Sequence, residues 1–394
     1  MTQGLLYGWE LGGGASHLEL ARGLLAALGG RFERVTLALR RLASAQARFG
    51  PAVQLFQSPV PEPAGLLPNP ASYAEILFEA GFHDRDALLS RLRAWDAILD
   101  AARPDVLVAD HAPTLLLASR GRAGLKRCCI GAGFFCPPPV APCPVFRSWD
   151  RVAPARPAAI EARVLDCINE ALRQRGVAPL ARVADLFELD EQFLTTTPEL
   201  DHYPGRGPAR YWGFYAAGDG GGRAADWPAG DGPRVFAYLS ADYPRLAELL
   251  AELVRLRWPS LVHVAGLPEA TRRSLAAPTL HLTADWLDMA DVTAAADLVV
   301  CHAGAGTMAW ALEQGRRLVT LPLHAEQTVA ALRLKAAGLG HALLSADPAQ
   351  FRRTLREAAQ DGALQACVDA LRSRLSPSRN NLAAIAARLG ELAA

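Results

Sequence analysis

The chain has 394 residues, of which 51% are apolar and 21% are charged, and its formal net charge is +1. This length predicts two or three globular domains, and the balanced charge without a basic block argues against a nucleic-acid partner. No run reaches the roughly 18–20 apolar residues of a membrane span, and segment 1–14 lacks the basic flank of a signal peptide, so we expect a cytoplasmic protein. The seven cysteines form no CxxC pair, which argues against a zinc site.

The first half of the sequence alternates short apolar runs with helical patterns, which is typical of βαβ units. Strands are expected at 5–9, 35–39 and 105–109, and helices at 17–28 and 158–175. Three consecutive glycines separate the first strand from the first helix. The proline-rich and aromatic stretch 131–157 has few backbone donors, so we expect a loop there that could line a ligand pocket.

A glycine-rich, polar and aperiodic stretch at 218–232 is the clearest linker in the sequence. After it the alternation restarts, with strands expected at 235–239, 262–265, 279–282, 298–301 and 318–321, and a helical stretch at 351–394. We therefore predict an α/β protein of two doubly wound, Rossmann-like domains that face a central cleft. The expected parts are an N-terminal domain at 1–217, the linker at 218–232, a C-terminal domain at 233–370, and a helical segment at 371–394 that could cross back to the first domain.

The most informative segment runs from Asp297 to Gln327. A buried strand is expected to end at Cys301, and a helix is expected to begin after His302-Ala303-Gly304-Ala305-Gly306-Thr307. Small residues after a strand let a ligand approach the backbone, and the free N–H groups at a helix start can hold an anion. From these residues alone, a diphosphate pocket without a Walker lysine and a tight turn without a ligand both remain open.

Three features surround this turn in a fixed order. Trp286 lies sixteen residues before His302, the small-residue turn follows, and Glu326-Gln327 come after a proline at the end of the next strand. This order resembles the donor-binding signature of the UDP-glycosyltransferase-like family, which has the GT-B fold, and especially that of bacterial transferases that glycosylate natural products. The resemblance implies a UDP-sugar or dTDP-sugar as co-substrate, with no cofactor and no metal.

The resemblance also implies roles for the matching residues. Trp286 would lie near the nucleobase, the turn from His302 would contact the diphosphate, and the Glu326-Gln327 pair would bind sugar hydroxyls. Core packing of the tryptophan and a solvated loop at the acidic pair remain open alternatives. The complete predicted donor set is Ser240, Trp286, His302, Gly304, Ala305, Gly306, Thr307, Glu326 and Gln327.

One position departs from the family pattern. The family usually has a glutamate eight residues after the histidine, which binds the ribose hydroxyls, and Trp310 stands at that position here. Glu313 lies three residues further along the same helix and could substitute for it. Both residues are therefore candidates for the ribose contact.

The glycine run of the first half leads directly into a histidine. Gly12-Gly13-Gly14-Ala15-Ser16-His17 resembles the corresponding turn of the peptidoglycan GlcNAc transferase, and in many related transferases this histidine is the general base. Asp110, at the end of a predicted strand, would orient His17 as the aspartate does in a hydrolase triad. His111 competes for the role of base, while a cap or core role for His17 and a helix N-cap role for Asp110 remain open.

The resemblance implies an inverting, metal-independent glycosyl transfer from the nucleotide sugar to a hydroxyl or amine of a small-molecule acceptor. His17 would take the acceptor proton, and backbone N–H groups with His302 would stabilise the leaving diphosphate. The alternatives are a nucleotide-sugar 2-epimerase of the same fold and a non-catalytic nucleotide-binding relative.

Overall fold

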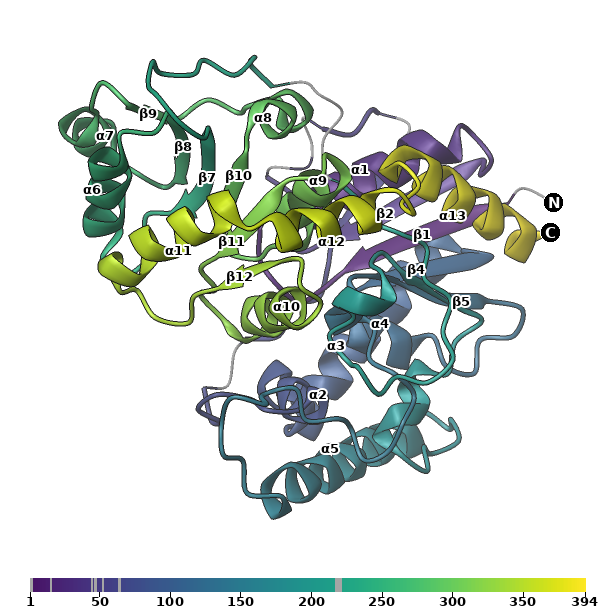
Figure 1. Cartoon of the computed structure of the whole chain (residues 1–394). Helices are drawn as coiled ribbons and strands as arrows, with labels where there is room; N and C mark the ends of the chain where they lie inside the picture. The colour runs from purple at the N-terminus through teal and green to yellow at the C-terminus, as the bar shows by residue number, and fades with distance from the viewer. Residues whose placement is uncertain are drawn as a thin grey trace. The chain divides into compact units, whose positions relative to one another are not determined.

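The computed structural model describes residues 3–14, 16–43, 45, 48–51, 53–62, 65–216 and 222–394. The chain forms two compact units. The first unit comprises Met1–Gly213 with Arg379–Ala394, and the second comprises Phe214–Ser378. Each unit is built on a six-stranded parallel sheet with helices around it (Figure 1). The predicted two-domain α/β architecture is thereby confirmed.

The first sheet has the strand order β3-β2-β1-β4-β5-β6. Its strands are β1 (Gly4–Trp9), β2 (Arg34–Leu39), β3 (Gln54–Gln57), β4 (Val106–Asp110), β5 (Lys126–Gly131) and β6 (Glu191–Leu194). The helices of this unit are α1 (Ser16–Leu28), α2 (Tyr73–Leu77), the π-helical η1 (Phe78–Phe82), α3 (Arg85–Ala102), α4 (Pro113–Ala118), α5 (Ala155–Gln174), α13 (Ser378–Ala393) and the 3-10 turns η2 (Gly133–Phe135), η3 (Val183–Phe187) and η4 (Pro198–Leu200).

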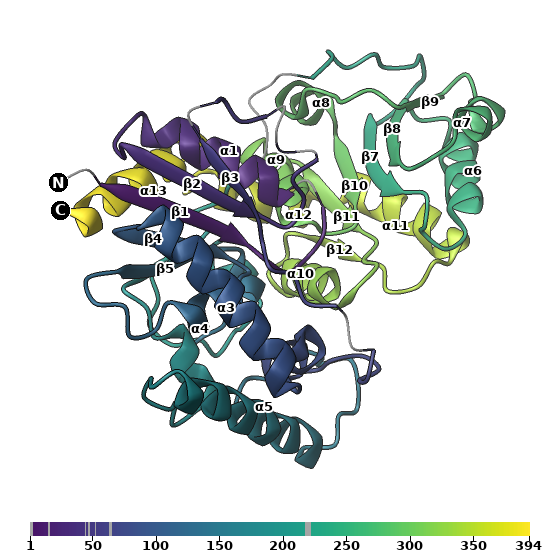
Figure 2. The same ribbon diagram turned by 180° about the vertical axis from the view of Figure 1, so that it is seen from behind.

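The two faces of the first sheet are covered by different helices. In Figures 1 and 2, α1 and α13 lie on one face and α3 and α4 lie on the other. β1 and β4 are buried along their whole length, as expected for central parallel strands that are covered on both sides. Helix α3 begins at Asp84, whose side chain accepts hydrogen bonds from two backbone amides of the first turn, and it buries a helical stripe that includes Leu88, Leu92, Trp95 and Leu99.

The second sheet has the strand order β12-β11-β10-β7-β8-β9. Its strands are β7 (Val235–Ser240), β8 (Ser260–Ala265), β9 (Leu280–Thr283), β10 (Leu298–Cys301), β11 (Arg317–Thr320) and β12 (Gly340–Ala342). Its helices are α6 (Leu246–Leu256), α7 (Glu269–Leu275), α8 (Met289–Ala295), α9 (Ala305–Glu313), α10 (Ala325–Ala336), α11 (Pro348–Gln360) and α12 (Gly362–Arg372). No helix in the described part of the chain is long and apolar enough to cross a membrane.

The strands expected from the sequence are all present within one or two residues of the predicted bounds. Stretch 131–157 is mostly irregular, as predicted, and contains η2 and the first turn of α5. The second part of the expected linker 218–232 is attached to the second unit. Arg223 forms an isolated parallel β-bridge with Leu287, and the Ala225 amide donates to Asp291. Residues 218–221 of that linker lie outside the described residues.

The chain passes from the first unit to the second and back again through neighbouring positions. The backbone N–H of Ala216 donates to the hydroxyl of Ser378 over 2.8 Å. Close to them, a side chain on Gly213 would overlap Asn381, so this glycine lies directly against the start of α13. Helix α13 then returns to the first unit, where Gln3 donates to the carbonyl of Ala393.

Each sheet has one point where the strand order reverses direction. In the first unit this switch point lies between β1 and β4, and in the second it lies between β7 and β10. Loops that follow the carboxyl ends of these strand pairs diverge and leave room for ligands in open α/β sheets. At the first switch point, Asp110 is the last residue of β4 and His17 comes after β1. At the second, Ser240 is the last residue of β7 and His302 comes directly after β10.

Candidate functional site

His17 and Asp110 meet at the switch point of the first sheet. His17 Nδ1 lies 2.7 Å from Asp110 Oδ2, and the side chains are 5% and 1% exposed. The Tyr7 hydroxyl donates to the same carboxylate oxygen over 2.6 Å. Because this oxygen accepts hydrogen bonds, the His17 Nδ1–H is the donor, and the lone pair of the neutral ring is then on Nε2. The arrangement leaves Nε2 available to take a proton.

Aromatic side chains hold the His17 ring in place. Trp9 stacks on it with a centroid distance of 4.8 Å, and Phe135 of η2 packs against it at 5.3 Å. Gly12 lies over the Nε2 atom of His17, because a Cβ built on this glycine would be only 3.0 Å from it. The φ of Gly12 is +82°, which also favours glycine. Both the backbone conformation and the close approach to His17 therefore require a glycine at this position.

His111 is positioned beside this pair but has a different environment. Its backbone has φ of +46°, and its carbonyl accepts the Leu11 amide, which ties the turn after β4 to the turn after β1. Both ring nitrogens are buried without a hydrogen-bond partner among the described residues. Burial, with a smaller effect from His17, lowers the pKa of His111 to about 3. A histidine that binds protons so weakly is a poor general base near neutral pH.

Helix α9 begins at the switch point of the second sheet. No side chain caps its start, where Gly304 is the N-cap and Ala305, Gly306 and Thr307 form the first turn. Ala303, immediately before, is fully buried with φ of +62°, which turns the chain sharply from β10 into the helix. The uncapped first turn can donate its N–H groups to an anion.

His302 connects the two central strands of the second sheet. Its Nδ1 lies 2.6 Å from the carbonyl oxygen of Leu321, which can only accept, and its Nε2 accepts the backbone N–H of Ser240 over 2.8 Å. Tyr243 stacks on the ring at 5.2 Å, and burial lowers the pKa of His302. With both nitrogens engaged, the ring braces the turn after β7, and the phosphate contact predicted for His302 stays a prediction.

Trp286 lies after β9, with its side chain 58% exposed. The indole is stacked on His263 at 6.0 Å, and His263 is stacked on Tyr238 at 5.1 Å. The core-packing alternative for this tryptophan is therefore wrong. An exposed indole supported from behind by two rings is a suitable platform for a flat base.

The remaining predicted donor residues have other contacts in the structure. The Ser378 hydroxyl donates to the Glu313 carboxylate, whose pKa is raised by burial, so this carboxylate is already engaged at the start of α13. Gln327 accepts the Leu323 amide over 2.9 Å, and Glu326 lies 3.7 Å from His324, both in the first turn of α10. Trp310 is half-buried on α9. Glu326 and Gln327 follow the carboxyl end of β11, whereas Trp310 and Glu313 stand in the last turns of α9, which runs away from that edge. The ribose contact stays a prediction.

Sequence reasoning missed Tyr7 and Glu10, and it considered Phe135 only as one of several aromatic residues that could line an acceptor pocket. Phe135 stands in a stretch that was expected to line a pocket, but nothing in the sequence indicated that its ring would reach His17. The strand register places Trp9, and not Tyr7, opposite Asp110, so pairing of the strands alone did not indicate the Tyr7 contact. Within the described part of the chain, no group of three His, Cys, Asp or Glu side chains is arranged to hold a metal ion.

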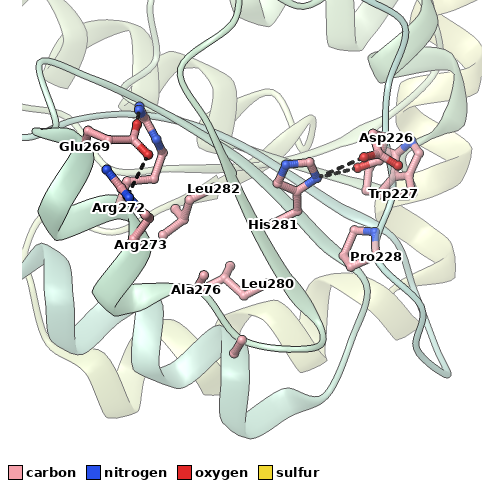
Figure 3. Close-up of a pocket in the computed structure, with 11 residues that line it drawn as sticks. Asp226, Trp227, Pro228, Glu269, Arg272, Arg273, Ala276, Leu280, His281 and Leu282 are labelled. Atoms are coloured by element: carbon pink, nitrogen blue, oxygen red, sulfur yellow. Dashed lines mark hydrogen bonds and ion pairs between the residues drawn. The ribbon is translucent and has the colours of Figure 1, made fainter.

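A separate hollow of about 330 Å³ lies between α7 and β9 of the second unit (Figure 3). Glu269 pairs on one side of it with Arg272 and Arg273, and on the other side His281 contacts Asp226, whose carbonyl oxygen lies 2.9 Å from Nδ1 of the histidine. None of its lining residues belongs to the predicted donor set.

Comparisons with known proteins identify the fold. Residues 260–385 match the Glycosyltransferase family 28 C-terminal domain. The glycosyltransferase of kitacinnamycin is 18% identical over 100% of both chains with a TM-score of 0.73, and the calicheamicin glycosyltransferase CalG4 is 17% identical over 100% of this chain and 98% of that chain with a TM-score of 0.71.

The spinosyn rhamnosyltransferase SpnG complexed with thymidine diphosphate is 19% identical over 94% of this chain and 95% of that chain, with a TM-score of 0.66. No curated protein matches the chain in sequence. The resemblance to the glycosyltransferases is confirmed at the level of fold and C-terminal domain. The chain has the GT-B fold, and residues 260–385 in its second half match the glycosyltransferase family 28 C-terminal domain.

Proposed function

We propose that the protein is an inverting glycosyltransferase that moves a sugar from a nucleotide diphosphate donor to a hydroxyl or amine of a small-molecule acceptor. The observation that carries the proposal is the buried His17–Asp110 pair at the first switch point. A neutral imidazole that is oriented through Nδ1 by a carboxylate is a general base for a hydroxyl proton. The GT-B fold and the glycosyltransferase C-terminal domain support the reaction class.

The donor is a UDP-sugar or dTDP-sugar held by the second unit. The uncapped first turn of α9 supplies N–H groups for the diphosphate, and exposed Trp286 supplies a surface for the base. Thymidine diphosphate is the more strongly supported nucleotide, because both SpnG and VinC have been solved with it. The diphosphate charge is stabilised by these backbone groups, so the reaction proceeds without a divalent metal.

The reaction is a single displacement. The acceptor proton passes to His17 Nε2, the acceptor oxygen forms a bond to the anomeric carbon, and the bond from that carbon to the diphosphate breaks. The nucleotide diphosphate leaves with the electron pair, so the configuration at the anomeric carbon inverts. Asp110 stabilises the charged imidazolium through the hydrogen bond that it already accepts.

The test is a His17→Ala substitution in the full chain. Transfer should fall by about a hundredfold or more, the low end of what a general base contributes. Nucleotide binding, measured by thermal shift with thymidine diphosphate and UDP, should be retained, because the donor residues lie in the other unit. His83→Ala is the matched control, since the His83 ring contacts the carbonyl and the ring of Phe78 and neither His17 nor Asp110, and transfer should be normal.

Three outcomes would redirect the proposal. Near-normal transfer by the His17→Ala variant would mean that another group takes the proton. Conversion of UDP-GlcNAc to its 2-epimer without any acceptor would favour the epimerase of the same fold. Failure of every nucleotide and nucleotide sugar to shift the melting temperature would favour a non-catalytic role.

A further inference from the structure

A buried ion pair lies behind the turn that carries Phe135. Arg206 Nε donates to Asp201 Oδ2 over 2.5 Å and its Nη2 donates to Asp201 Oδ1 over 3.0 Å, with the side chains only 3% and 1% exposed. Tyr211 and the Tyr203 amide donate to the same carboxylate over 2.8 Å and 3.0 Å. A buried carboxylate and guanidinium with this many partners form a rigid unit rather than a loose surface contact.

The remaining guanidinium donors of this pair hold the turn itself. Arg206 Nη1 donates to the carbonyl of Cys136 over 2.6 Å, and Nη2 donates to the carbonyl of Gly133 over 3.1 Å. Gly133 rests directly on the pair, because a Cβ there would be 2.2 Å from Asp201 Oδ1. Both ends of η2 are thus fixed by one arginine, and glycine is needed where the turn meets the aspartate.

The fixed turn directs its two phenylalanines to different places. Phe135 packs on His17 at 5.3 Å and on His111 at 4.8 Å. Phe134 contacts Phe146 at 5.1 Å and His202 at 5.5 Å, and it packs edge-on against Phe135 at 5.8 Å. Trp9 stacks on the His17 ring at 4.8 Å, and the histidine is only 4% exposed.

We propose that Phe135, positioned by the Asp201–Arg206 pair, keeps water away from His17 so that the acceptor, and not water, gives up its proton to this base. The inference rests on the proposed function. If water replaces the acceptor, its proton passes to His17 Nε2, its oxygen bonds to the anomeric carbon, and the nucleotide diphosphate leaves, so the sugar is released free. A closed aromatic site suppresses this side reaction.

The test compares donor hydrolysis with transfer in the full-length protein. Free sugar and glycoside are both quantified in one reaction that contains dTDP-sugar or UDP-sugar with acceptor. Phe135→Ala should raise the ratio of hydrolysis to transfer by about threefold or more, the size of one lost aromatic contact expressed as a rate. Phe135→Leu, which keeps an apolar cover, should restore most of the wild-type ratio.

The ion pair is tested in the same assay. Arg206→Lys keeps the charge but loses the planar fork, so the ratio should rise as in Phe135→Ala. Asp96→Asn is the control, because it breaks ion pairs to Arg122 and Arg175 in the same unit without reaching η2, and its ratio should match the wild type.

The outcomes separate this inference from the proposed function. In the double variant His17→Ala with Phe135→Ala, the extra hydrolysis should disappear, because no base remains to activate water. An unchanged ratio in Phe135→Ala, in a protein whose wild type transfers sugar, would overturn the water-excluding role alone. A wild type that releases nucleotide from no donor would overturn the proposed function and this inference together.

Discussion

Glu10 provides a test of the structure that does not depend on activity. It follows β1 and is fully buried. Its carboxylate accepts the Thr114 backbone N–H over 2.9 Å and also the Thr114 hydroxyl. Burial raises the pKa of Glu10 from 4.5 to about 7, in spite of these hydrogen bonds and of the nearby Arg91, which act in the opposite direction.

This pKa sets the sign and the size of a pH effect on stability. Between about pH 4.5 and 7 the folded chain keeps the Glu10 proton while the unfolded chain releases it, so the free energy of unfolding falls as the pH rises. The contribution of Glu10 is fully present below about pH 4.5 and is lost as the pH rises through 7. Because each tenfold change in proton affinity corresponds to 1.36 kcal/mol, the whole titration amounts to about 3 kcal/mol.

The perturbation is Glu10→Gln, which keeps an acceptor for Thr114 but cannot ionise. The variant should gain stability relative to the wild type as the pH rises from about 5 to about 8, measured by urea denaturation of both proteins at each pH. Asp201→Asn is the control. Burial alone would raise the pKa of Asp201, but its bonds to Arg206 lower this pKa overall. Asp201 is therefore ionised between about pH 5 and 8 in both the folded and the unfolded chain. A difference between the wild type and Glu10→Gln that stays constant with pH would refute the reasoning.

The remaining predictions concern the donor site. Excess chelator should leave transfer unchanged, and complete loss that magnesium or manganese restores would count against the stabilisation of the diphosphate by α9. Trp286→Ala should weaken binding of thymidine diphosphate by about 1–3 kcal/mol in a calorimetric titration, whereas Trp227→Ala, a tryptophan elsewhere in the same unit, should not; equal affinities would place the base elsewhere. Glu313→Ala should lower the melting temperature through the lost bond from Ser378 while nucleotide affinity is kept, and Trp310→Ala should weaken affinity; the reverse pattern would make Glu313 the ribose ligand.

Much of the fold follows from local patterns in the sequence. The strands that flank the two switch points are long apolar runs, and β1, β4, β7 and β10 were all predictable from them. The edge strands β3, β6 and β12 were missed, because short edge strands are partly polar and give no such run. The inner strand β5 was missed as well; it begins with Lys126 and Arg127, which shorten its apolar run. The alternation of elements was then enough to predict two Rossmann-like units.

The candidate site was predictable only where a residue adjoins a recognisable turn. His17 and Asp110 follow from their positions at strand ends, because parallel strands bring those ends to one edge. Phe135 and its supporting Arg206 could not be predicted, since the contact joins parts of the chain that no local pattern links. The buried Glu10 was missed for a similar reason: its partner Thr114 is 104 residues away in sequence.

The bond between Ala216 and Ser378 bears on how the chain folds. The first unit is discontinuous, so helix α13 must find its place after the whole of the second unit has been made. In an unfolded chain this closure would carry the entropic cost of a very long loop. Once the second unit has folded, the hydrogen bond between Ala216 and Ser378 holds its two ends together. The loop that must close when α13 docks on the first unit is then effectively only a few residues long. Folding of the second unit therefore lowers the entropic cost of docking α13, because α13 then joins the first unit through a short effective loop.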